Sequence, residues 1–118
     1  MQQDEKLDAL VKRFTELAVK ILIPMDQVIN RLHRRENIRR FYFALADSRE
    51  RLIQFLNIKK VDDFVIILLK MNQLLNKITK INPESQFSNE EASNLILQLA
   101  EWRSLIYQAV VDMSTNGY

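Results

Sequence analysis

Glycine and proline are almost absent from this chain. Its 118 residues include one glycine, Gly117, and two prolines, Pro24 and Pro83. Tight turns, β-bulges and glycine-rich loops need residues that tolerate unusual backbone angles. Apolar residues make up 47% of the chain and charged residues 27%, which is typical of a folded protein. The sequence therefore predicts a single all-α domain, residues 1–118, built from long helices with short connections.

Apolar residues recur at spacings of three and four along four segments. These segments predict helices at residues 4–34, 37–56, 61–81 and 89–114. Ser88 and Glu91 have the spacing of a capping box, which marks the start of the last helix. Four helices with short links favour a four-helix bundle.

The first helix contains Pro24, and its apolar stripe, which begins at Leu7, Leu10, Val11 and Phe14, continues through this residue. Proline removes one helical hydrogen bond and clashes with the preceding turn. We therefore expect a kink at Pro24, and a first helix split in two is the alternative.

The sequence lacks the residues that most enzymatic chemistry requires. Cysteine is absent, and the single histidine, His33, lies opposite the apolar stripe and is expected to face solvent. A di-metal site in a bundle needs Glu-x-x-His elements, but the residue three before His33 is Asn30. No glycine-rich loop is present to bind a phosphate. We therefore expect no enzymatic activity, metal, cofactor or small-molecule substrate.

The sequence also bears on location. Absence of cysteine fits a reducing compartment, and the charged first ten residues do not resemble a signal peptide. The longest uninterrupted apolar run, residues 64–69, is far too short to span a bilayer. These features predict a cytoplasmic protein without a membrane span.

Arginine is concentrated in one stretch. Seven of the nine arginines lie between Arg31 and Arg51, where they outnumber the acidic residues by four, whereas lysine prevails elsewhere. Ion pairs at spacing four, Glu36–Arg40 and Asp47–Arg51, explain part of the pattern as an ordinary solvated helix face. The helical register places two others, Arg34 and Arg49, close to the apolar stripe.

An exposed aromatic residue among these arginines suggests a binding surface. In the register of the second helix, Phe43 has no inward position. Arginine pairs bidentately with phosphate or carboxylate and stacks on rings. The predicted site for nucleic acid (DNA or RNA) or an acidic partner, protein or lipid headgroup, consists of Arg31, Arg35, Arg39, Arg40 and Phe43. Arg31, Arg35 and Arg39 would form a row if the helix continued through residues 34–37.

The last two helices carry more apolar residues than one core-facing stripe needs. The additional residues suggest an interface for a second copy or another protein. They are Val65, Ile66, Leu69, Ile96, Tyr107 and Val111. A wide core-facing sector is the simpler explanation. The sequence thus predicts a non-enzymatic, oligomeric accessory or assembly subunit that binds through its arginines. The alternative is a structural or regulatory adaptor that binds proteins through helices three and four, without nucleic acid.

Overall fold

The computed structural model describes the backbone of residues 2–116 and, within them, the side chains of Ala9, Lys12, Arg13 and residues 15–112. This part of the chain forms four α-helices and no strands, which confirms the predicted all-α class. The helices are α1 (Gln2–His33), α2 (Ile38–Leu56), α3 (Asp62–Ile78) and α4 (Asn89–Asn116). The side chains of Leu7, Leu10, Val11 and Phe14, where the predicted stripe begins, lie outside the described residues.

The helix boundaries differ from the predicted ones by a few residues. α3 ends at Ile78, three residues early, because the Lys80 and Ile81 amides donate to the carbonyls three residues back, a tighter turn than an α-helix. α1 is helical on both sides of Pro24, so it is not split there. A kink at Pro24 stays a prediction.

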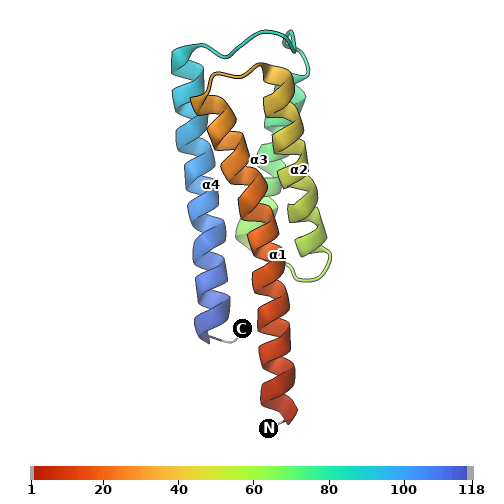
Figure 1. Ribbon diagram of the computed structural model, residues 1–118. Helices are drawn as coiled ribbons and strands as arrows, with labels where there is room; N and C mark the ends of the chain where they lie inside the picture. The colour runs from red at the N-terminus through yellow and green to blue at the C-terminus, as the bar shows by residue number, and fades with distance from the viewer. Residues whose placement is uncertain (1, 117–118) are drawn as a thin grey trace.

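The helices lie side by side and contact one another in the order α3, α2, α1, α4 (Figure 1). α3 and α4 also touch, but far more sparsely than the other neighbours. α1 and α4 run antiparallel, so the start of α1 and the end of α4 lie toward the same end of the molecule, with α1 reaching further (Figure 1). α1 has 32 residues and α2 only 19, so α1 continues well beyond α2.

The core is rich in aromatic side chains from all of the last three helices. Trp102 is 2% exposed, and the rings of Phe55 and Phe64 join α2 to α3 with centroids 5.0 Å apart. Phe87, in the loop before α4, packs edge-on against Phe41 of α2 at 5.1 Å. This contact holds the loop of residues 82–88 against the start of α2.

Candidate functional site

The turn between α1 and α2 is a Schellman cap. The Glu36 amide donates to the Arg31 carbonyl at 3.1 Å, and the Arg35 amide donates to the Leu32 carbonyl at 3.2 Å. Arg35 takes the left-handed conformation (φ 59°) at the position where glycine is usual. The helix therefore ends before the turn, and the predicted row of Arg31, Arg35 and Arg39 does not form.

The loop of residues 82–88 caps the start of α2. The Ile38 amide donates to the Ser85 carbonyl at 2.9 Å, and the Arg39 amide donates to the Pro83 carbonyl at 3.0 Å. The first amides of a helix have no partner within the helix, so these carbonyls satisfy them. The loop is thereby held beside the arginines of α2.

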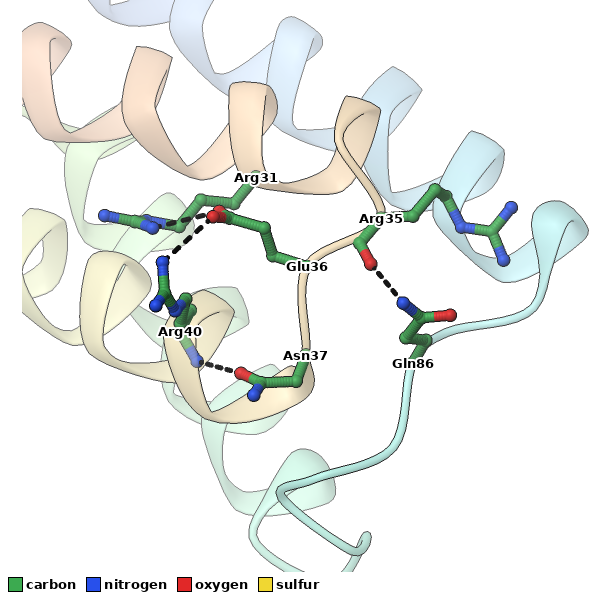
Figure 2. Close-up of polar contacts among 6 residues, drawn as sticks. All are labelled: Arg31, Arg35, Glu36, Asn37, Arg40 and Gln86. Carbon is green, nitrogen blue, oxygen red and sulfur yellow. Dashed lines mark hydrogen bonds and ion pairs between the residues drawn. The ribbon is translucent and has the colours of Figure 1, made fainter.

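Glu36 lies between two of the predicted site residues (Figure 2). Arg31 Nη1 donates to Glu36 Oε2 at 2.9 Å, and Arg40 Nη1 donates to Glu36 Oε1 at 3.2 Å. The predicted Glu36–Arg40 pair is therefore confirmed. The Arg40 amide donates to Asn37 Oδ1 at 3.1 Å, which caps α2. A single half-buried carboxylate thus brings the end of α1 and the start of α2 together.

Arg35 belongs to a different part of the surface. Figure 2 shows its side chain extending away from Arg31 and Arg40. Arg35 Nη2 donates to the Phe87 carbonyl at 2.8 Å, and the Arg35 carbonyl accepts from Gln86 Nε2 at 2.6 Å. Arg35 therefore ties the loop of residues 82–88 to the end of α1, and it does not lie with the other four residues of the predicted site.

Three open hollows connect the remaining residues. The first is lined by Arg31 and Arg34, the second by Arg31, Arg40 and Phe43, and the third by Arg39 and Phe43. Adjacent hollows share Arg31 or Phe43, so the five residues form one continuous surface. We call it the arginine surface: Arg31, Arg34, Arg39, Arg40 and Phe43. Phe43 is 65% exposed, as the helical register predicts.

Arg34 and Arg49, both predicted to lie close to the apolar stripe, differ in burial. Arg34 is exposed, and its guanidinium has no partner among the described residues, so the prediction that it lies near the apolar stripe is wrong. Arg49 is half-buried, and its Nη1 donates to Asn72 Oδ1 on α3 at 3.2 Å. Its partner is a side-chain amide, so Arg49 links α2 to α3.

Carboxylates neutralise only part of the arginine stretch. Arg39 pairs with Glu84 of the loop, and Arg51 Nε lies 3.9 Å from Asp47 Oδ1, which confirms the second predicted pair. Glu84 adds a fourth acid to the three within residues 31–51. The seven arginines still exceed these acids by three. The arginine stretch, with Glu84 included, therefore keeps a net positive charge.

The six predicted interface residues do not lie on one face. Val65 and Leu69 share a side of α3 with Asn72, which bonds to Arg49 of α2. Val65 is half-buried, whereas Leu69 and the neighbouring Ile66 are exposed. On α3, Val65 and Leu69 therefore lie on the side toward α2.

The corresponding residues of α4 lie on the opposite side of the molecule. Tyr107 shares a side of α4 with Arg103, whose Nε donates to Asp26 Oδ1 of α1 at 2.5 Å. Ile96 on this side is half-buried, and Tyr107 and Val111 are exposed. Since this side faces α1, the rows on α3 and α4 cannot contact the same flat partner surface.

Five further exposed large apolar residues among the described ones are not indicated by the sequence pattern: Val19 and Ile23 on α1, Ile58 after α2, and Leu97 and Leu105 on α4. Val19 and Ile23 are four residues apart and lie off the main stripe of α1. Two apolar residues four apart can indicate a second apolar face of a helix. Here only two residues carry this pattern, and the longer apolar stripe of α1 beside them masks it.

A half-open hollow of about 230 Å³ lies where α3 and α4 touch sparsely. Its lining is apolar at the floor and polar at the rim. The apolar members are Leu74, Ile78, Ile81, Phe87 and Leu95, and the polar members are Lys77, Glu91, Asn94 and Gln98.

Among the side chains that the structure describes, no three His, Cys, Asp or Glu residues gather as a metal site would require. None of the helices, over the described residues, combines the length and apolar character needed to cross a membrane. Comparison with protein-family models, with curated proteins and with solved structures finds no match.

Proposed function

We propose that this chain is a non-enzymatic four-helix-bundle interaction protein, an accessory or assembly subunit whose arginine surface binds a nucleic acid backbone. The observation that carries the proposal is the position of Phe43. Its ring is 65% exposed between hollows lined by Arg40 and by Arg39. A ring in this position can stack on a base while neighbouring guanidinium groups bind its phosphates.

The ion pairs at this surface do not prevent such binding. Arg39 and Glu84 are both more than half exposed, and Arg40 is similarly exposed at its pair with Glu36. An exposed ion pair contributes only about 0.2–1 kcal/mol, whereas a bidentate arginine–phosphate contact is stronger and more directional. A phosphate can therefore replace or join these carboxylates. Arg34 has no side-chain partner among the described residues, so it can bind a phosphate without breaking an ion pair.

A mobility-shift assay with labelled single- and double-stranded DNA and RNA at low salt tests the proposal. We expect wild-type protein to bind and the Arg34→Glu/Arg39→Glu/Arg40→Glu variant to lose about tenfold or more in affinity. The control changes the same total charge elsewhere, with Lys20→Glu/Lys60→Glu/Lys70→Glu, three exposed lysines outside the arginine surface.

The control should keep most of the binding. Absence of any shift with wild-type protein, or equal losses in the two variants, would contradict the proposal. The buried Trp102 reports by fluorescence that each variant is folded. Binding to heparin or to an acidic polypeptide, but to no nucleic acid, would instead assign the surface to an acidic partner.

The adaptor is a second candidate, because α3 exposes two large apolar side chains. Ile66 is 50% exposed and Leu69 57%, and burying them in water-free contact with another protein would be favourable. This candidate predicts that wild-type protein binds no nucleic acid and that Leu69→Glu changes the association state in sedimentation. If Leu69→Glu sediments as the wild type does, the candidate loses its support for self-association.

A further inference from the structure

α4 carries a second line of residues that does not face the core. Leu97, Ala100, Ser104, Tyr107 and Val111 follow one another at alternating spacings of three and four, and all five are exposed. We call this line the α4 seam. Alternation of three and four is the spacing by which one helix packs along another in a coiled coil. Leu97, at 70%, is the most exposed large apolar side chain among the described residues.

Two residues of α1 extend this surface. The Asp26–Arg103 pair fixes the register of the two helices. Ile23 and Val19 precede Asp26 by three and seven residues, and Tyr107 and Val111 follow Arg103 by four and eight. Because the helices run antiparallel (Figure 1), all four apolar residues lie on the same side of the ion pair along the molecule.

We propose that this surface binds a second copy of the chain, with the two α4 helices antiparallel about a two-fold axis through Ser104. Seven residues separate Ser104 from Leu97 in one direction and from Val111 in the other, about 10 Å each way. The axis therefore places Leu97 of one copy on Val111 of the other, beside Val19. This arrangement is independent of nucleic acid binding.

The order of side-chain sizes favours a second copy over another partner. Reversal about Ser104 sets serine against serine. It also brings the bulky Tyr107, three residues after the axis, next to the small Ala100 of the second copy, four residues before it, an offset of one residue or about 1.5 Å. A parallel pair would set Tyr107 against Tyr107 and leave a gap between the two alanines. The α4 seam thus complements its own reversed copy about Ser104. Two-fold pairing of identical surfaces is the commonest form of self-association.

Charge also permits this pairing. Under the same reversal the uncharged Gln108 of the second copy, four residues after the axis, comes next to Glu101, three residues before it. Arg103 lies close to the axis, but its charge is balanced by Asp26 of its own chain. The acidic Glu101 beside the α4 seam therefore does not face another acidic side chain. Pairing of two copies brings no unbalanced like charges together.

Single cysteines test the register, since the natural chain has none. Ser104→Cys should form a disulfide-linked dimer under mild oxidation, because the axis brings the two copies of this residue together. Ser93→Cys is the matched control, because it continues the α4 seam but lies eleven residues from the axis. It should stay monomeric on a non-reducing gel. Cross-linking of both variants to the same extent indicates a parallel pair and overturns the proposal, as does cross-linking of neither.

Sedimentation over roughly a hundredfold range of protein concentration tests the surface itself. We expect wild-type protein to form dimers and Leu97→Glu to weaken association about tenfold or more. Leu69→Glu, at a leucine that is 57% exposed on α3, should leave the dimer unchanged. Wild-type protein that is monomeric throughout, or a Leu69→Glu variant that dissociates as readily as Leu97→Glu, overturns the proposal. Leu97 is outside the core, so glutamate there should not unfold the chain.

Discussion

The carbonyl of Arg35 accepts a hydrogen bond from the side-chain amide of Gln86 at 2.6 Å, 51 residues further along the chain. The guanidinium of Arg35 donates at 2.8 Å to the carbonyl of the next residue, Phe87. These two contacts hold the loop before α4 against the end of α1. They also explain why arginine replaces glycine at a left-handed position: its side chain stabilises a contact that glycine could not make.

Substitutions at Arg35 separate the backbone effect from the side-chain effect. Arg35→Ala loses the bond to Phe87 and keeps the left-handed conformation, so we expect a loss of about 1–2 kcal/mol in the free energy of unfolding. Arg35→Gly loses the same bond but relieves the conformation, which costs an L-residue about 1 kcal/mol or more. The glycine variant should thus be more stable than the alanine variant by about 1 kcal/mol. Urea unfolding followed by Trp102 fluorescence measures both. Equal stabilities would contradict the left-handed conformation at Arg35.

Substitution of serine by alanine should have opposite effects on stability at Ser48 and at Ser88. Ser48 is fully buried on α2, and its hydroxyl has no hydrogen-bond partner among the described residues. Ser48→Ala should therefore leave stability unchanged or raise it by about 1 kcal/mol, since a buried unsatisfied hydroxyl is unfavourable. A loss of stability in this variant would indicate a partner for the hydroxyl.

Ser88 is the matched case at the start of α4. Its Oγ accepts from the Glu91 amide at 3.1 Å and donates to the Glu91 carboxylate at 3.1 Å. Ser88→Ala should lower the free energy of unfolding by about 1 kcal/mol through loss of the cap. Chemical denaturation compares the two serine variants directly, and the same sign for both would contradict this account.

The ion pair between Asp26 and Arg103 orients α1 relative to α4 and contributes little to stability. Both side chains are close to half exposed, so we expect a coupling free energy of about 0.5 kcal/mol in a double-mutant cycle of Asp26→Asn and Arg103→Gln. The coupling should fall further in high salt because exposed charges are screened. A coupling of several kcal/mol at high salt would mean that the pair is buried in solution.

Much of the fold could be predicted from local sequence patterns. The four helices follow from apolar spacing, and the start of α4 follows from Ser88 and Glu91, because both signals act within one or two turns. The end of α3 was less predictable, since neither glycine nor proline marks the turn at residues 79–81.

The candidate site was only partly predictable, because its contacts are not local. The exposure of Phe43 follows from the register of a single helix. The separation of Arg35 from Arg39 and Arg40 depends on the left-handed conformation of Arg35, which no glycine in the sequence marks. The pairing of Arg39 with Glu84, and the opposite sides occupied by Leu69 and Tyr107, depend on how distant segments pack.

The most direct test of the central claim is the salt dependence of nucleic acid binding by the arginine surface. If three arginines contact a single strand, the logarithm of the association constant should fall with the logarithm of salt concentration at a slope of about −2. Arg40→Gln should reduce the magnitude of this slope by about 0.7, whereas Arg13→Gln, an exposed arginine near the other end of α1, should leave it unchanged. A slope near zero for wild-type protein, or equal slopes for wild type and Arg40→Gln, would contradict the claim.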